Sequence, residues 1–158
     1  MNDSDKKFMQ MAIELAYEGM RNNEGGPFGA IIIKNHTIIG QGYNRVTSSN
    51  DPTAHAEIVA IRDACKNLGN FQLTDCILYT SCEPCPMCLG AVYWARLARI
   101  FYGCSHVDVA NIDFDDDLIY KELTVPMTER KIPIIQLLRE DALKTFLEWK
   151  SKQDKIKY

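Results

Sequence analysis

Pro84-Cys85-Pro86-Met87-Cys88 lies between a short apolar run at 76–80 and a helix that we expect to begin at Pro86 and to end near residue 95. Proline suits the first turn of a helix, because the N–H that it lacks would have no partner there. The apolar run predicts a buried strand, and a second strand is predicted over 99–102. This strand, helix and strand form the centre of the predicted fold.

The segments on the N-terminal side extend this unit. Apolar residues at three- and four-residue spacing predict a helix over 3–22, and two β-rich runs at 30–34 and 37–43 predict a hairpin. After a polar loop, a helix is predicted from about 54 to 68, with Thr53 as its N-cap. The order helix, hairpin, helix, strand, helix, strand is typical of the α/β class. We therefore predict a three-layer α/β/α sandwich with a mixed central sheet.

The C-terminal part of the chain is more polar. The region 111–122 contains an acidic run, the region 133–138 predicts a further strand or an extended arm, and Asp141 is the predicted cap of a last helix. Residues 150–158 form a lysine-rich tail. No repeat or linker divides the sequence, so we predict a single domain over residues 1–158.

The composition is that of an ordinary globular protein. The chain has 158 residues, of which 46% are hydrophobic and 25% charged, and this is enough for one sizeable core. No apolar run approaches the ~20 residues of a membrane span, and the first residues lack the apolar core of a signal peptide. The six cysteines indicate free thiols in a reducing compartment more than a disulfide framework, so we expect a cytoplasmic protein.

The net charge is unevenly distributed along the chain. Residues 150–158 contain four lysines and one aspartate, a net charge of +3; because the total is −3, the remaining body carries −6. Proteins that grip nucleic acid usually carry a basic stripe on their folded part. This charge distribution counts against tRNA or DNA as a partner, and the lack of an apolar span counts against a membrane.

Three residues in two short motifs have the side chains of a zinc site. His55 precedes Cys85 by 30 residues, and Cys88 follows three residues later near the start of a predicted helix, so both thiolates face the same way. One imidazole and two thiolates give a tetrahedral zinc three ligands and leave the fourth position for water. Glu57, two residues after the histidine, is placed to move the protons of that water. We predict one zinc ion per chain.

Other interpretations of these motifs are open at this point. A structural zinc would take a fourth protein ligand, for which Cys82 is the candidate, and Cys82 with Cys85 could instead form a redox pair. A closed site would leave Glu57 without a role, whereas an open site uses it to pass protons to a departing amine. His-x-Glu followed by Pro-Cys-x-x-Cys is the signature of zinc-dependent nucleobase deaminases.

The chain resembles the cytidine deaminase superfamily and, within it, the compact bacterial guanine deaminases. The resemblance implies a cytidine deaminase-like fold, one bound zinc and a homodimer. It also implies that the segment 150–158 crosses to the neighbouring subunit and closes its active site with Tyr158. The motifs shared across the superfamily are Pro52 to Glu57 and Thr80 to Cys88, and the more selective stretches are Gly90 to Arg96, Asp113 to Asp116, Ile119 to Glu122 and the final Tyr158.

The same resemblance implies roles for further residues. Asn44 matches the amide that holds the edge of the purine, and Asp116 matches a second catalytic acid, beside Glu57, close to the substrate amine. Phe28 and Trp94 match the walls of the pocket. Each has a structural alternative: the two aromatic rings as plain core, Asn44 as the end of a strand, and Asp116 as part of a solvated acidic turn.

The residues and the resemblance together predict an enzyme that hydrolyses the free purine base guanine to xanthine and releases ammonia. One alternative is a tRNA adenosine deaminase or another nucleobase or nucleoside deaminase, which would share the zinc motifs; a tRNA enzyme would show a basic groove beside them. A second alternative is a zinc-stabilised binding module without turnover, in which Glu57 would be superfluous.

Overall fold

The computed structural model describes residues 3–111, 114 and 116–158. The chain divides into two compact units, residues 1–117 and residues 118–158. The described strands all lie in the first unit, and the second unit is helical.

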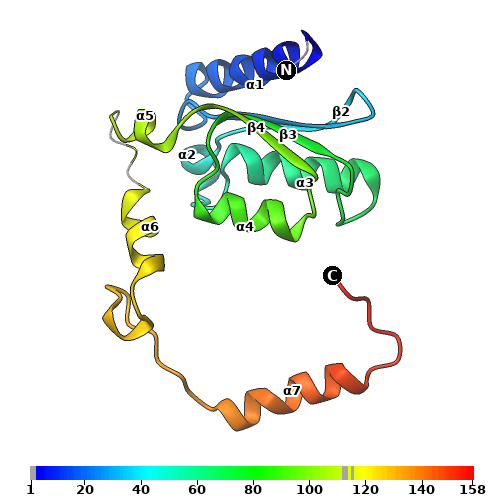
Figure 1. Cartoon of the computed structure of the whole chain (residues 1–158), viewed down its shortest axis with the longest axis vertical. Helices are drawn as coiled ribbons and strands as arrows, with labels where there is room; N and C mark the ends of the chain where they lie inside the picture. Colours follow the sequence, from blue (N-terminus) through cyan, green and yellow to red (C-terminus); the bar gives the residue numbers. More distant parts are fainter. Residues whose placement is uncertain (1–2, 112–113, 115) are drawn as a thin grey trace. The chain divides into compact units, whose positions relative to one another are not determined.

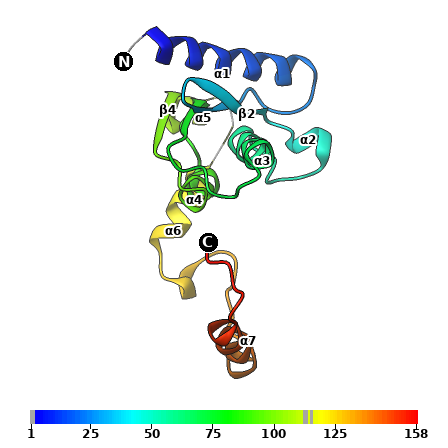
Figure 2. The same cartoon turned by 90° about the vertical axis from the view of Figure 1, so that its right-hand side faces the viewer.

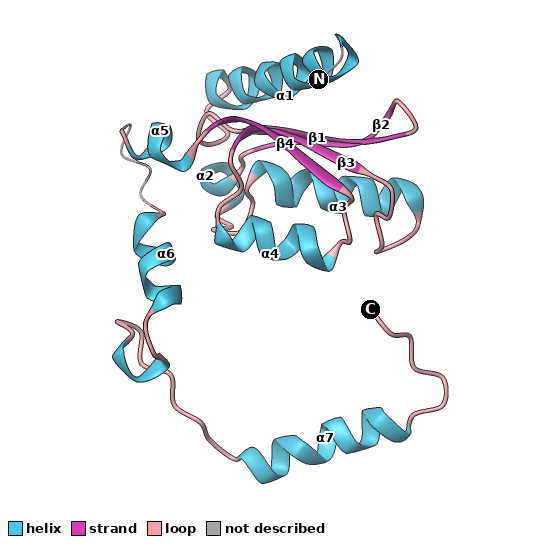
Figure 3. Cartoon of the chain, viewed as in Figure 1, coloured by secondary structure: helices cyan, strands magenta, loops and turns pink. Residues whose placement is uncertain are grey.

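A mixed sheet of four strands forms the middle of the first unit (Figure 3). The spatial order is β2-β1-β3-β4, with β1 antiparallel to both of its neighbours and β3 parallel to β4. The predicted hairpin thus forms one half of the sheet, and a parallel pair forms the other half. The strands are β1 (Gly29–Lys34), β2 (Thr37–Tyr43), β3 (Ile77–Cys82) and β4 (Arg99–Cys104).

Helices cover both faces of this sheet (Figure 1). The helix α1 (Asp3–Arg21) packs on one face, and α3 (Ala56–Leu68) and α4 (Pro86–Trp94) lie on the other. The view turned by 90° shows the same three layers (Figure 2). Two shorter helices, α2 (Val46–Ser49) and α5 (His106–Ala110), lie in the connections. The predicted three-layer α/β/α sandwich with a mixed sheet is confirmed.

The core is built on β1, which is buried on both faces. Its side chains alternate between two apolar clusters, because successive side chains of a strand point to opposite faces. Ile31 lies in one cluster with Ala12 of α1, whereas Ile32 lies in the other with Ala60 of α3. The helix α1 comes so close that a Cβ atom at Gly29 would lie 2.2 Å from the carbonyl oxygen of Ala12. Glycine is therefore required at this position.

Some element ends differ from the prediction, and local contacts explain the differences. The N-cap of α3 is His55 and not Thr53, because the Thr53 hydroxyl donates to Asp51 Oδ1 at 2.7 Å instead. Part of the expected polar loop forms the short helix α2. The strands β3 and β4 run to Cys82 and Cys104, further than predicted, and these two cysteines pair in the parallel register. The two strands therefore end side by side next to the cysteine motif.

The second unit contains α6 (Asp117–Thr124) apart from its first residue, the 3₁₀ turn η1 (Met127–Glu129) and α7 (Arg139–Ser151). The segment 133–138 forms no strand. Every residue from 118 to 158 is at least partly exposed, so this unit has no buried core of its own.

The start of α7 corrects the predicted cap. The helix begins after Leu138, whose backbone has a φ of 50°, and the Asp141 carboxylate pairs with Lys144 at 2.7 Å. No described helix is both long and apolar enough to cross a membrane. The assignment of residues 1–158 to one functional domain stays a prediction.

Candidate metal and substrate site

The three predicted metal ligands come together at the starts of two helices. His55 is the N-cap of α3, Cys85 is the N-cap of α4, and Cys88 lies in the first turn of α4. Their ligand atoms all lie within 4.8 Å of one another. Both N-cap residues are extended, with ψ angles of 155° and 168°, which is the ordinary backbone of a residue that precedes a helix. The positive ends of two helix dipoles therefore meet at this cluster.

The donor set and its spacing fit zinc. Cys85 Sγ lies 3.6 Å from His55 Nδ1. Tetrahedral bond lengths of about 2.3 Å to sulfur and about 2.0 Å to nitrogen place such a pair of ligand atoms about 3.6 Å apart. Among the described residues, the group of side chains that could hold a metal consists of these three, so the fourth position of a tetrahedral ion is left open.

The charges of the cluster also call for a cation. The pKa of Cys85 is lowered to about 4, first by a hydrogen bond from Cys88 and then by His55. The pKa of Cys88 is raised, first by the same hydrogen bond and then by burial. Two adjacent sulfur atoms cannot both be thiolates in a buried place unless a positive ion lies between them. A zinc ion removes this conflict.

Glu57 lies against the ligand cluster. It is in the first turn of α3 and only 5% exposed. Its Oε2 lies 3.5 Å from Cys88 Sγ, and its Oε1 accepts from the Thr80 hydroxyl at 3.3 Å. Burial is the main cause that raises the pKa of Glu57. A carboxyl group with a raised pKa, next to an open metal position, is suited both to take and to return a proton.

Cys82, the candidate for a fourth ligand, is not part of the cluster. It ends β3, is buried, and directs its thiol to the carbonyl oxygen of Ser105 at 4.0 Å. Burial raises the pKa of Cys82 to about 12, which also argues against a reactive redox thiol. The closed structural site is therefore not supported.

Asn44 is buried and held in one orientation. Its Oδ1 accepts from the backbone N–H of Gly26 at 3.3 Å and of Val46 at 3.1 Å. Two backbone donors fix which end of the amide is oxygen, so its NH2 group is the end left to donate to a ligand. The contact is tight, since a Cβ atom at Gly25 would lie 2.2 Å from this oxygen.

Two aromatic rings lie next to each other over Gly26. Phe28 and Phe114 pack edge to face with centroids 5.0 Å apart, and a Cβ atom at Gly26 would touch both rings. The sequence predicted Phe28 as a pocket wall but gave Phe114 no role of its own. The signal was its place between the acidic residues of the selective stretch 113–116.

The remaining predicted residues have different positions. The charge of Asp116 contributes to the raised pKa of His55, after the larger effects of Cys85 and Glu57, so this carboxylate lies within electrostatic range of the metal ligands. Trp94 is 68% exposed and lies six residues after Cys88, about 9 Å further along α4 at 1.5 Å per residue. Tyr158 belongs to the second unit. Asp113 and Asp115 lie outside the described residues.

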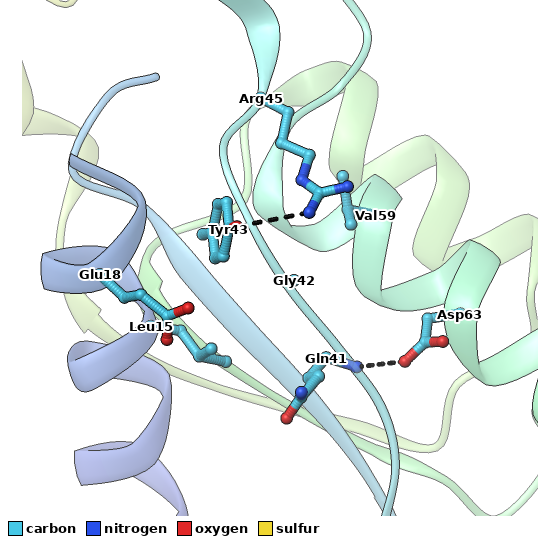
Figure 4. A pocket seen from close by; sticks show the side chains of 8 residues that line it. All are labelled: Leu15, Glu18, Gln41, Gly42, Tyr43, Arg45, Val59 and Asp63. Atoms are coloured by element: carbon cyan, nitrogen blue, oxygen red, sulfur yellow. Dashed lines mark hydrogen bonds between the residues drawn. The ribbon is translucent and has the colours of Figure 1, made fainter. Parts of the chain in front are cut away.

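A separate pocket of about 470 Å³ lies between α1, β2 and α3 (Figure 4). Part of its polar lining is paired within the chain. Arg45 donates to the Tyr43 hydroxyl at 3.3 Å, and the Gln41 backbone N–H donates to Asp63 Oδ2 at 3.0 Å. No metal ligand lines this pocket, so we do not place the substrate there.

Known proteins match the chain over most of its length. Guanine deaminase of Bacillus subtilis (strain 168) is 55% identical over 151 residues, which cover 96% of this chain and 97% of that protein. An X-ray structure of guanine deaminase from Bacillus subtilis matches with a TM-score of 0.95 and 54% identity, covering 100% of this chain and 99% of the other.

A second enzyme class is also similar. A tRNA-specific adenosine deaminase of Buchnera aphidicola subsp. Schizaphis graminum (strain Sg) is 37% identical over 133 residues, 84% of each chain. Residues 2–104, which include all three metal ligands and Glu57, match the model of one protein family. With this match, the resemblance predicted from the motifs is confirmed. The chain belongs to the family described as the cytidine and deoxycytidylate deaminase zinc-binding region.

Proposed function

We propose that this protein hydrolyses guanine to xanthine and ammonia. The observation that carries the proposal is the buried Glu57 carboxylate, which touches Cys88 beside a metal cluster with an open fourth position. A structural metal site has no use for such a group. The substrate is chosen from the likeness to Bacillus subtilis guanine deaminase, which extends over nearly the whole chain.

In the proposed mechanism, His55, Cys85 and Cys88 would hold a zinc ion, which would supply an activated water at its open position. Glu57 takes a proton from this water as the oxygen attacks the ring carbon that bears the amine. Glu57 then passes this proton to a ring nitrogen, takes the remaining proton of the added hydroxyl group and gives it to the departing amine, so that ammonia leaves and a carbonyl remains.

The substrate-binding residues extend this proposal. The NH2 group of Asn44 would donate to an acceptor on the edge of the purine, because its oxygen already accepts two backbone donors. Phe28 and Phe114 would form an aromatic wall, and Asp116 would accept from the substrate amine. Trp94 would form a second wall of the substrate pocket. Such a site rejects bases that lack the matching groups, since its own polar atoms would be left unpaired.

We further propose a homodimer in which the C-terminal segment of one chain covers the active site of the other and places Tyr158 there. The support is the apolar surface of the second unit, where no residue is buried. Such a surface is expected to be covered by protein. Its most exposed large apolar side chains are Ile132, Ile135, Leu137, Leu138, Phe146, Ile156 and Tyr158.

The competing function is adenosine deamination in tRNA, which the similar tRNA-specific enzymes favour. The acidic residues at 113–117 and the net charge of −6 outside the tail argue against a nucleic acid partner. We also propose that the protein works in the cytoplasm, because thiolate ligands need a reducing compartment.

The test is a screen for ammonia release by the zinc-loaded protein. Guanine, other aminopurines, cytosine, cytidine, adenosine and a tRNA stem-loop are offered separately, with Glu57→Gln as the inactive control. We expect release from guanine. Release from the stem-loop and not from guanine would establish the competing function, and binding of a base without release would indicate a module without turnover.

A further inference from the structure

A carboxylate–imidazole pair lies beside the cysteine motif, and the proposed mechanism does not use it. Glu83 stands two residues before Cys85, in the connection between β3 and α4. Its Oε2 accepts from His106 Nδ1 at 2.9 Å and from the backbone N–H of His106 at 3.1 Å. One carboxylate oxygen thus receives two donors from a single residue. This geometry fixes both the side chain and the backbone of His106.

The backbone of Glu83 is anchored as well. Its N–H donates to the carbonyl oxygen of Cys104, the last residue of β4, at 2.8 Å. The same residue therefore holds the end of β4 through its backbone and the first residue of α5 through its side chain. α5 already has its own capping box, formed by Ser105 and Asp108. The contact from Glu83 is thus not needed to cap α5 and comes from outside it.

The segment that follows α5 carries residues of the candidate site. The backbone N–H of Phe114 donates to the carbonyl oxygen of Val109 in α5 at 3.4 Å, and the Phe114 ring packs on Phe28. The pKa of His106 is raised first by Glu83, and the negative charge of Asp116 contributes further. Asp116 is thus in electrostatic range of His106 as well as of His55.

We propose that Glu83 and His106 are positioning residues, which fix α5 relative to the metal-ligand loop and thereby hold Phe114 and Asp116 over the substrate. This inference rests on the roles proposed above for Phe114 and Asp116. Neither member of the pair touches the reacting atoms. Each acts by setting where the next segment of the chain lies.

A merely structural role would leave a different signature. The His106 side chain is 45% exposed and the Glu83 side chain 31% exposed. Ion pairs with this exposure contribute little to the free energy of unfolding. A change in thermal stability is therefore not the expected effect. Positioning predicts instead a change in the kinetic constants for the substrate, since small misplacements of contacting groups can reduce turnover strongly.

The experiment uses the full zinc-loaded chain and measures kcat, KM for guanine, zinc content and melting temperature. Glu83→Ala and His106→Leu are expected to raise KM and to lower kcat/KM roughly ten- to hundred-fold, with zinc content and melting temperature close to those of the unmodified protein. His106→Asn is the conservative variant, because its side-chain NH2 lies where Nδ1 donates, and it should recover most of kcat/KM. If Glu83→Ala is unstable, Glu83→Gln and His106→Leu carry the same test.

Lys6→Ala is the matched control, because it breaks the exposed pair between Lys6 and Asp3 on α1 and should change no constant. Unchanged kinetics in both Glu83→Ala and His106→Leu would overturn the proposal. Loss of zinc in proportion to activity would overturn it too, since the pair would then act on the ligand loop. Failure of His106→Asn to recover activity would exclude the assigned hydrogen bond.

Double-mutant cycles separate this proposal from the roles on which it rests. Glu83→Ala is combined with Asp116→Asn and, separately, with Phe114→Ala. Effects that are less than additive support action through that partner, and full additivity in both cycles overturns the positioning role. If Asp116→Asn alone leaves activity unchanged, the proposed role of Asp116 fails, and coupling to Phe114→Ala still supports the positioning role.

Discussion

The two units of the chain treat the same kind of side chain in opposite ways. Ile31 and Ile32 of the first unit are completely buried, whereas Ile135 and Leu137 of the second unit are about four-fifths exposed, at 83% and 80%. The metal ligands and Glu57 all belong to the first unit, so the groups proposed for the chemistry are assembled in one core. Tyr158, proposed to close the pocket, belongs to the unit without a core. We infer that chemistry and closure can be separated by mutation.

The largest effect is expected from the metal ligands. Cys85→Ser should remove zinc and all measurable activity, because two ligands cannot hold the ion as three do. Cys82→Ser, three residues away in the same motif, should keep both. Metal analysis and the ammonia assay on the two purified variants check this. Equal zinc loss in both would restore Cys82 as a fourth ligand.

Glu57→Gln should have the next largest effect. The amide keeps the size of the side chain but cannot accept and return a proton, so turnover should fall by a factor of ~10² or more while zinc stays bound. Steady-state kinetics with metal analysis measure this. Turnover that survives the substitution would remove Glu57 from the mechanism.

Deletion of residues 154–158 should reduce turnover less severely and leave folding and zinc content unchanged. The reason is that the deletion removes the proposed closing residue Tyr158 and no group of the first unit. A closed pocket excludes water and strengthens the electrostatic interactions within it. Circular dichroism, metal analysis and kinetics on the truncated chain test this separation.

Mixing the truncated chain with the Glu57→Gln chain tests whether the tails are exchanged between subunits. The truncated chain keeps Glu57 and the metal ligands but lacks residues 154–158. The Glu57→Gln chain keeps those residues but lacks the proposed catalytic carboxylate. In a hybrid dimer with exchanged tails, the pocket of the truncated chain would combine its own Glu57 with the tail of the Glu57→Gln chain. Recovery of activity on mixing is expected, and its absence in proven hybrid dimers would show that the tail serves its own chain or has no role.

Substitutions of packed or exposed apolar side chains should affect activity least, and their effects are measured on unfolding and on dimer dissociation. Ile32→Ala should lower the free energy of unfolding by about 2–5 kcal/mol at any protein concentration, because it leaves a cavity in a closed core. Ile135→Ala should change unfolding of the first unit by less than about 0.5 kcal/mol and instead favour dissociation of the dimer. Denaturant unfolding at two protein concentrations separates the two. A concentration-independent loss in Ile135→Ala would contradict the dimer.

The sequence predicts those parts of the fold that strong local patterns determine. The continuous apolar run of β1 and the Pro86 start of α4 require only β-propensity and proline geometry. The metal cluster follows from motif spacing, since His55 and Cys85 each stand at a helix start. The cap of α3 could not be predicted, because it depends on the competing bond between Thr53 and Asp51.

Such local patterns do not predict contacts between residues that are far apart in the sequence. The pairing of Glu83 with His106 spans 23 residues and joins the connection after β3 to the first residue of the short helix α5, and no local pattern links the two. The contact of Phe114 with Phe28 is of the same kind. The start of α7 depends on the left-handed backbone of Leu138, a conformation that sequence does not favour for leucine.

The opposed acidities of Cys85 and Cys88 make metal loading an acid–base reaction. Cys88 holds its proton while Cys85 beside it is ionised, so the arriving ion must displace that proton into the buffer. The apparent affinity should then rise about tenfold per pH unit for each proton released. Two samples at the same free zinc concentration but different pH would therefore contain different fractions of zinc-loaded protein.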